Sequence, residues 1–142
     1  MAKAVRSVIF SDYFLVGFIG LVFFADIIAW TNGWTLVYSW IDQVSHFSGG
    51  FWAAIFFVAL FFRFSELQKF SLFLENKFLA LVLILSFVAL IGISWEFFEF
   101  VFNVIGDLPD TMNDLFLDLV SGFVGAILSL WLIRNRDTSI LR

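Results

Sequence analysis

Four long apolar runs, separated by short polar stretches, organise the chain. A helix that crosses a bilayer needs about 20 consecutive, mostly apolar residues. Each run reaches this length, so the pattern predicts an all-α integral membrane protein with four transmembrane helices in a single domain, residues 1–142. The predicted helices are residues 7–30, 41–62, 77–104 and 111–133.

The three connections differ in character. Residues 31–40 are rich in tryptophan and tyrosine, which favour the interface between water and lipid. Residues 63–76 alternate Phe and Leu with polar residues, and we interpret them as an amphipathic helix lying in the interface. Residues 106–110 contain Gly106 and Pro109, which predict a turn that ends the third helix.

The amino-acid composition agrees with a membrane protein and excludes several kinds of functional site. The hydrophobic fraction is 62% and the mean hydropathy is +1.01, well above the values of soluble domains. The chain has no cysteine, which excludes disulfides, thiolate metal sites and cysteine nucleophiles. There is no basic patch with interleaved aromatic residues, so we predict no nucleic-acid partner.

Charge is distributed very unevenly across the predicted membrane. All eight basic residues fall on one side: Lys3, Arg6, Arg63, Lys69, Lys77, Arg134, Arg136 and Arg142. Basic residues favour the cytoplasmic side. We therefore predict a plasma (inner) membrane protein whose N- and C-termini are both cytoplasmic, with the aromatic and acidic connections outside.

Acidic groups and the single histidine gather on the opposite side, at similar depth. Their spacing along each helix is i, i+3 or i, i+4, so each pair shares one face. The same faces carry small residues such as Gly50, Gly92 and Gly122, which mark close helix packing in membranes. We therefore expect the charged faces to point into the bundle. The pairs are Asp42 with His46, Glu96 with Glu99, and Asp114 with Asp118.

Such a cluster requires neutralisation. An ionised side chain near the centre of a transmembrane helix costs about 2.5–3.5 kcal/mol, and no Lys or Arg is placed to offset it here. Carboxylates and an imidazole without thiolates suit Mg, Mn, Ca, Fe or Zn. Protons held by some of the carboxylates are one way to neutralise the cluster, and a divalent metal ion, of unknown identity, is the cofactor that we predict. Its predicted ligands are Asp42, His46, Glu96, Glu99, Asp114 and Asp118.

Phosphate-bearing lipid head groups lie at the depth of this cluster, so membrane lipids are the expected partners. A bound divalent ion can polarise a phosphoryl oxygen and activate water. We interpret His46 and Glu96 as candidate catalytic residues of a hydrolase that acts on a lipid-linked or phospholipid head-group substrate. Transition-metal redox chemistry is less favoured, because di-iron bundles use Glu-x-x-His and this chain has Glu-x-x-Glu.

Other functions remain open. The same carboxylates would serve a proton or metal-ion transporter, which needs a polar route past Asp12 and Ser86 in the cytoplasmic half. A non-catalytic lipid-binding or scaffolding subunit, as a homo-oligomer or with a membrane-complex partner, is a third possibility. Local roles compete as well: Asp110 or Thr111 can cap the fourth helix, with Asp114 in a capping box.

The polar residues of positions 41–126 also form a recognisable series. The series is Asp42-x-x-x-His46-Phe47-x-Gly-Gly, Trp95-Glu96-x-x-Glu99 and Asp110-Thr111-x-x-Asp114-x-x-x-Asp118, followed by Gly122. It resembles the YjdF-like group of small bacterial membrane proteins and, more distantly, the VanZ-like proteins. VanZ-like proteins carry an Arg before the last helix, which is missing here, so the YjdF-like resemblance is favoured. The resemblance implies a multi-pass inner-membrane location and no particular activity.

Overall fold

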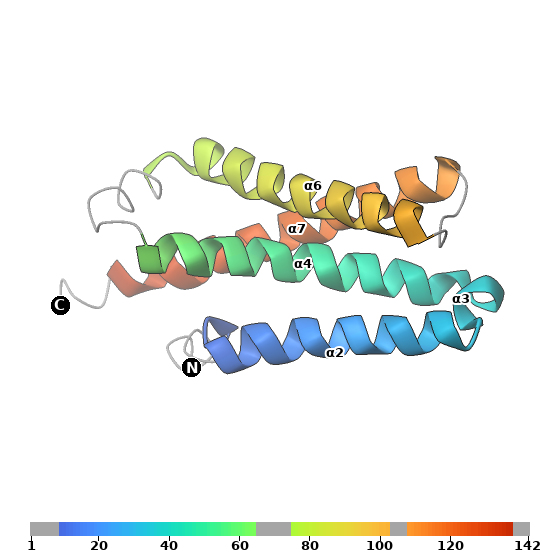
Figure 1. Cartoon of the computed structure of the whole chain (residues 1–142). Coiled ribbons are helices and arrows are strands. Elements are labelled where there is room, and N and C mark those ends of the chain that lie inside the picture. The colour runs from blue at the N-terminus through green and yellow to red at the C-terminus, as the bar shows by residue number, and fades with distance from the viewer. Residues whose placement is uncertain (1–8, 65–74, 103–107, 138–142) are drawn as a thin grey trace.

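Four long helices lie side by side in the computed structural model, which describes residues 9–64, 75–102 and 108–137 (Figure 1). All four are long and apolar enough to cross a membrane, which confirms the prediction of an all-α chain with four helices of this kind. The end of α7 lies at the same end of the bundle as the start of α2 (Figure 1). The helices are α2 (Asp12–Thr31), α4 (Ser39–Phe64), α6 (Lys77–Phe102) and α7 (Leu108–Asp137), with the one-turn helix α3 (Trp34–Val37) between α2 and α4.

The start of α7 differs from the prediction. The helix begins at Leu108 rather than at residue 111. Pro109 is tolerated in the first turn because the backbone N–H that it lacks would have no partner within the helix. Asp110 and Thr111 therefore lie inside the first turn, and the prediction that one of them caps the helix is wrong.

Two predicted features fall on parts of the chain that the structure does not describe. The amphipathic helix was expected at residues 63–76, of which 65–74 lie outside the described residues. Of its described flanks, Arg63 and Phe64 belong to α4. Most of the predicted turn before α7 lies outside as well, because residues 103–107 are not described.

Small residues bring α4 and α7 together, as their spacing predicted. A Cβ atom added to Gly50 would meet the backbone of Asp118, and one added to Gly125 would lie 2.7 Å from the carbonyl oxygen of Phe51. The helix backbones are therefore in direct contact at these positions. Farther along α4, Ala54 and Val58 belong to the apolar core, together with other small or branched residues.

The other pairs of helices are in less extensive contact than α4 and α7. Two side-chain hydrogen bonds join α2 to α4: Trp52 Nε1 donates to the carbonyl oxygen of Leu15 (2.7 Å), and Ser45 Oγ donates to Asp26 Oδ1 (2.8 Å). The outward faces carry large apolar side chains, among them Phe24 and Ile127, which are 65% and 51% exposed. In a membrane these faces contact lipid.

Candidate functional site

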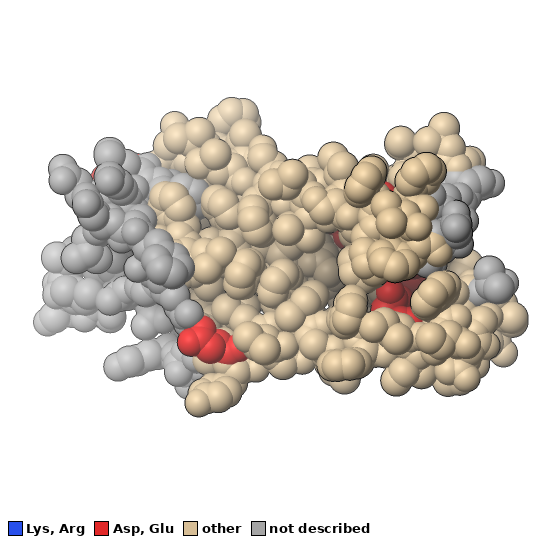
Figure 2. Space-filling model, viewed as in Figure 1, with Lys and Arg blue, Asp and Glu red and all other residues tan. Residues whose placement is uncertain are grey.

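The predicted polar residues gather inside the bundle at the end that carries α3. His46, Asp114 and Asp118 are almost completely buried, with 3%, 2% and 5% of their surface exposed. His46 lies two turns into α4, about 10 Å from its start at a rise of 1.5 Å per residue. In Figure 2, acidic residues (red) are visible at this end in gaps between other side chains (tan).

His46 is the centre of the cluster. Its Nδ1 atom lies 3.3 Å from Asp118 Oδ2 on α7, at hydrogen-bonding distance. Its Nε2 atom lies 3.7 Å from Glu96 Oε1 on α6 and 3.9 Å from Asp42 Oδ1 on its own helix. A carboxylate can only accept a hydrogen bond, so a neutral imidazole in this position carries its proton on Nδ1 and a lone pair on Nε2. The lone pair then faces Glu96 and Asp42.

Three buried atoms around this point have no hydrogen-bond partner. They are His46 Nε2, Glu96 Oε1 and Asp114 Oδ1, one each from α4, α6 and α7. The 3.7 Å between His46 Nε2 and Glu96 Oε1 is too long for a hydrogen bond. An unsatisfied buried polar group typically costs about 1–3 kcal/mol. Three of them at one point indicate a place that suits a ligand.

The same three residues satisfy the distance requirement of a metal site. Each offers one donor atom, and these atoms lie within 4.8 Å of one another. A Zn-like ion about 2.0–2.2 Å from each ligand would separate tetrahedral ligands by roughly 3.5 Å. Small side-chain rotations would therefore bring all three donors onto one ion.

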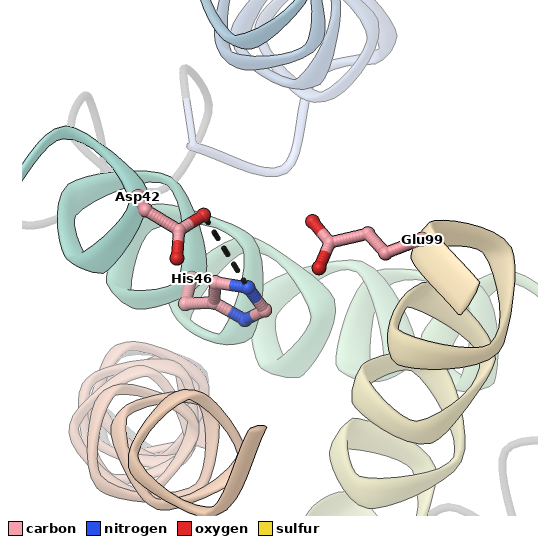
Figure 3. Close-up of side chains that lie close together, drawn as sticks. All are labelled: Asp42, His46 and Glu99. Atoms are coloured by element: carbon pink, nitrogen blue, oxygen red, sulfur yellow. Dashed lines mark ion pairs between the residues drawn. The ribbon is translucent and has the colours of Figure 1, made fainter. Parts of the chain in front are cut away.

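Two further groups adjoin this one and share members with it. Asp42, His46 and Glu99 form the first, and Asp42, Asp110 and Asp114 form the second, each with donor atoms within 4.8 Å. Figure 3 shows Glu99 reaching from α6 toward Asp42 and His46 on α4. Trp95 Nε1 donates to Glu99 Oε1 (2.8 Å), which holds that carboxylate at the edge of the cluster.

Five of the six predicted ligands thus occur in these groups, and two residues differ from expectation. Asp118 belongs to none of the groups, because its carboxylate faces the other side of the His46 ring. Asp110 belongs to one of them, although its sequence context suggested a helix cap. Its i, i+4 spacing to Asp114 was the available indication.

Glycine leaves the space that Asp118 occupies. A Cβ atom at Gly92 of α6 would clash with Asp118 Oδ2, the oxygen that faces His46 Nδ1. A Cβ atom at Gly50 of α4 would clash with the backbone oxygen of the same residue. Both glycines therefore let α7 approach closely enough for the Asp118–His46 contact.

The charge balance is strongly negative. Asp42, Glu96, Glu99, Asp114 and Asp118 surround a single imidazole. Among the described residues, no Lys or Arg side chain pairs with these carboxylates; Lys77 lies at the opposite end of α6. Burial strengthens the mutual repulsion of the carboxylates, because the interior has a low effective dielectric constant. A cation is the chemical complement of this arrangement.

Comparison with known proteins gives one match. A family model described as "Predicted membrane protein (DUF2238)" matches residues 6–136. The YjdF-like group is this family, so that resemblance is confirmed, whereas the more distant VanZ-like likeness stays a prediction. No curated protein and no solved structure matches the chain.

Proposed function

The chain belongs to the DUF2238 family of predicted membrane proteins, and we propose that it binds a divalent cation inside its helix bundle. The observation that carries this proposal is the convergence of three unpartnered buried atoms from three helices: His46 Nε2, Glu96 Oε1 and Asp114 Oδ1. A divalent ion would satisfy all three at once and reduce the repulsion among the carboxylates.

The residues around the ion would have distinct roles. His46, Glu96 and Asp114 would be the first ligands, and Asp42 and Glu99 would complete the coordination shell. Asp118 would act indirectly: by accepting a hydrogen bond from His46 Nδ1, it would fix the ring and direct Nε2 toward the ion. Carboxylate–histidine–metal arrangements of this kind raise the basicity of the imidazole ligand. The oxygen-rich donor set fits Mn, Fe, Zn or Mg.

Hydrolysis of a phosphate ester at the membrane surface is the use that fits this site best. A bound cation would supply polarisation of a phosphoryl oxygen and activation of water. Glu96 would accept the proton of the attacking water with the carboxylate oxygen that does not hold the ion. It would return that proton to the ester oxygen as the bond between this oxygen and phosphorus breaks. The His46 imidazole, oriented by Asp118, would hold the opposite side of the site.

Metal analysis of the purified protein tests the cation proposal. We expect wild-type protein, prepared without chelator, to carry close to one divalent ion per chain. Glu96→Gln keeps the size of the side chain but removes its charge, and should reduce affinity by at least about tenfold, as loss of a shell residue does in other metal sites. Inductively coupled plasma mass spectrometry and equilibrium dialysis measure both quantities.

The matched control is Asp12→Asn. It removes an exposed carboxylate at the first residue of α2, which lies at the end of this helix away from the site. It should leave metal content unchanged. A folded wild-type protein that takes up no Mg, Mn, Fe, Zn or Ca from solution would overturn the proposal.

The orientation in the membrane is a separate proposal, carried by the distribution of the eight basic residues. Both termini would be cytoplasmic, and the connection around α3 would face outward. The chain has no cysteine, so single cysteines can be introduced freely. In intact spheroplasts, a membrane-impermeant maleimide should label Asn32→Cys but reach Glu75→Cys only after permeabilisation. Both positions are exposed. Labelling in the reverse order would show the opposite orientation.

Transport by this chain is less well supported. Ser86 is exposed and donates to the carbonyl oxygen of Val82 in its own helix, and Asp12 is also exposed. Apart from the site residues, the buried polar side chains of the described core are Ser121 and Ser129. These residues do not line a polar path through the second half of the bundle.

A further inference from the structure

A cavity of about 450 Å³ adjoins the site between α2, α4 and α6. Its walls are mainly apolar, formed by side chains such as Val16, Ile19 and Phe23 of α2 and Val88 and Ile91 of α6. Its volume lies in the range of roughly 300–1,000 Å³ that is typical of small-molecule sites. The cavity is therefore large enough to receive part of a ligand.

Glycines create this space. Gly20 of α2 and Gly49 of α4 both line the cavity, and a Cβ atom added to either would meet nothing within 4 Å. At Gly50 and Gly92, in contrast, the absence of a side chain admits Asp118. The glycines of one region thus serve two purposes: some allow close packing, and others leave an opening.

Polar groups lie at one end of the cavity only. His46 and Asp118 reach it from the proposed cation site, and Asp26 lies beside them, hydrogen-bonded to Ser45. A ligand that fills the cavity would therefore have an apolar body and one polar end. The polar end would lie against the residues that orient or hold the cation.

The side of the cavity between α2 and α6 is the one that lipid would reach. α2 packs along α4 but has little contact with α6. The rings of Phe23 and Trp95 meet edge to face across this gap, with centroids 6.2 Å apart. Val16, in the cavity wall, is 70% exposed. A hydrocarbon chain in the bilayer could thus enter sideways between α2 and α6.

We propose that this cavity holds the hydrocarbon chain of a single-chain membrane amphiphile whose phosphate-bearing end reaches the His46 cluster. The placement of the phosphate depends on the proposed cation site. The placement of the hydrocarbon chain depends only on the cavity. A transmembrane helix of a partner is a poorer occupant, because a helix about 10 Å across would exceed this volume after roughly one turn. The shared chemistry, a long chain carrying one phosphate, occurs in monoacyl glycerol phosphates and in isoprenyl phosphates.

Photo-crosslinking in phosphatidylcholine nanodiscs tests the proposal. The probe is a monoacyl glycerol phosphate with a diazirine in the middle of its chain, and peptide mass spectrometry locates the adducts. We expect adducts on the cavity-facing residues of α2 and α6. Unlabelled farnesyl phosphate and unlabelled monoacyl glycerol phosphate are then added as competitors; the stronger competitor identifies the preferred source of the chain.

Cavity-filling variants make the test specific. Gly20→Leu and, independently, Gly49→Leu should reduce crosslinking at least about tenfold, the lower end of what a steric change in an apolar pocket achieves. Gly17→Leu is the control: Gly17 lies on the same helix, is exposed and does not line the cavity. Adducts spread evenly over the outer faces of all four helices, or equal loss in Gly17→Leu, would overturn the proposal.

Repeating the experiment with chelator separates this inference from the proposed function. Adducts that persist in chelator would support the chain slot, and they would contradict the cation site only if the protein also takes up no metal without chelator. Metal bound by untreated protein without adducts in the cavity would support the cation site and contradict the proposed binding of a hydrocarbon chain.

Discussion

Replacing His46 with alanine is expected to weaken divalent-cation binding by about 100-fold or more, beyond the 10–100-fold that loss of an outer-shell partner costs. The imidazole is the single nitrogen donor in the three candidate metal groups of the described residues, and it belongs to two of these groups. Its removal also leaves Asp118 without its partner on α4. Equilibrium dialysis with Mn²⁺ and Zn²⁺ measures the loss directly.

Asp26→Asn is the control for this substitution. Asp26 lies close to the site and lines the neighbouring cavity, but it belongs to none of the candidate metal groups. It should keep wild-type affinity. If His46→Ala does not fold, Asp118→Asn provides a second measurement, because it preserves the shape of the side chain while weakening the orientation of the ring; its expected loss is about 10–100-fold. Wild-type affinity in folded His46→Ala, or in Asp118→Asn where His46→Ala does not fold, would refute the proposed role of His46.

Much of this site could be predicted from the sequence because helical spacing is a strong constraint. Asp42 with His46, and Glu96 with Glu99, share helix faces whatever the arrangement of the bundle. The run of small residues then identified those faces as internal, and Gly50 and Gly92 do lie at close contacts. Burial of the cluster could be inferred from these two patterns alone.

The different roles of the residues could not be predicted in the same way. Whether Asp118 faces Nδ1 or Nε2 of His46 depends on the rotation of α7 and on its register along α4, and neither is encoded in spacing within one helix. The same holds for Asp110, whose place in a candidate group depends on the extra turn of α7 that begins at Leu108. Local capping rules gave Asp110 a plausible but wrong role.

The cavity also lies beyond sequence reasoning. Gly49 and Gly50 are adjacent and identical, yet one faces open space and the other faces the backbone of α7. A helix places neighbouring residues about 100° apart, so only the position of the partner helix determines which glycine is packed. This difference can be measured directly, because each glycine can be replaced by the same residue.

Gly50→Ala is expected to destabilise the protein by about 1–3 kcal/mol, the usual range for overpacking a close contact. The added methyl group would lie 2.5 Å from Ser121 Oγ and 2.6 Å from the Cα of Asp118. Because backbone atoms are involved, a side-chain rotation cannot relieve the clash, and α7 must move away from α4. That movement also carries Asp118 away from His46. We therefore expect cation affinity to fall together with stability.

Gly49→Ala, one residue away on the same helix, should have neither effect. Its Cβ atom meets nothing within 4 Å, and alanine favours a helix over glycine by up to about 1 kcal/mol. Unfolding by a graded series of SDS concentrations, followed by tryptophan fluorescence, compares the two variants; dialysis then measures their cation affinity. Equal stability of the two variants would contradict the close α4–α7 contact at Gly50. Loss of stability in Gly50→Ala with unchanged cation affinity would instead show that the contact between Asp118 and His46 does not govern cation binding.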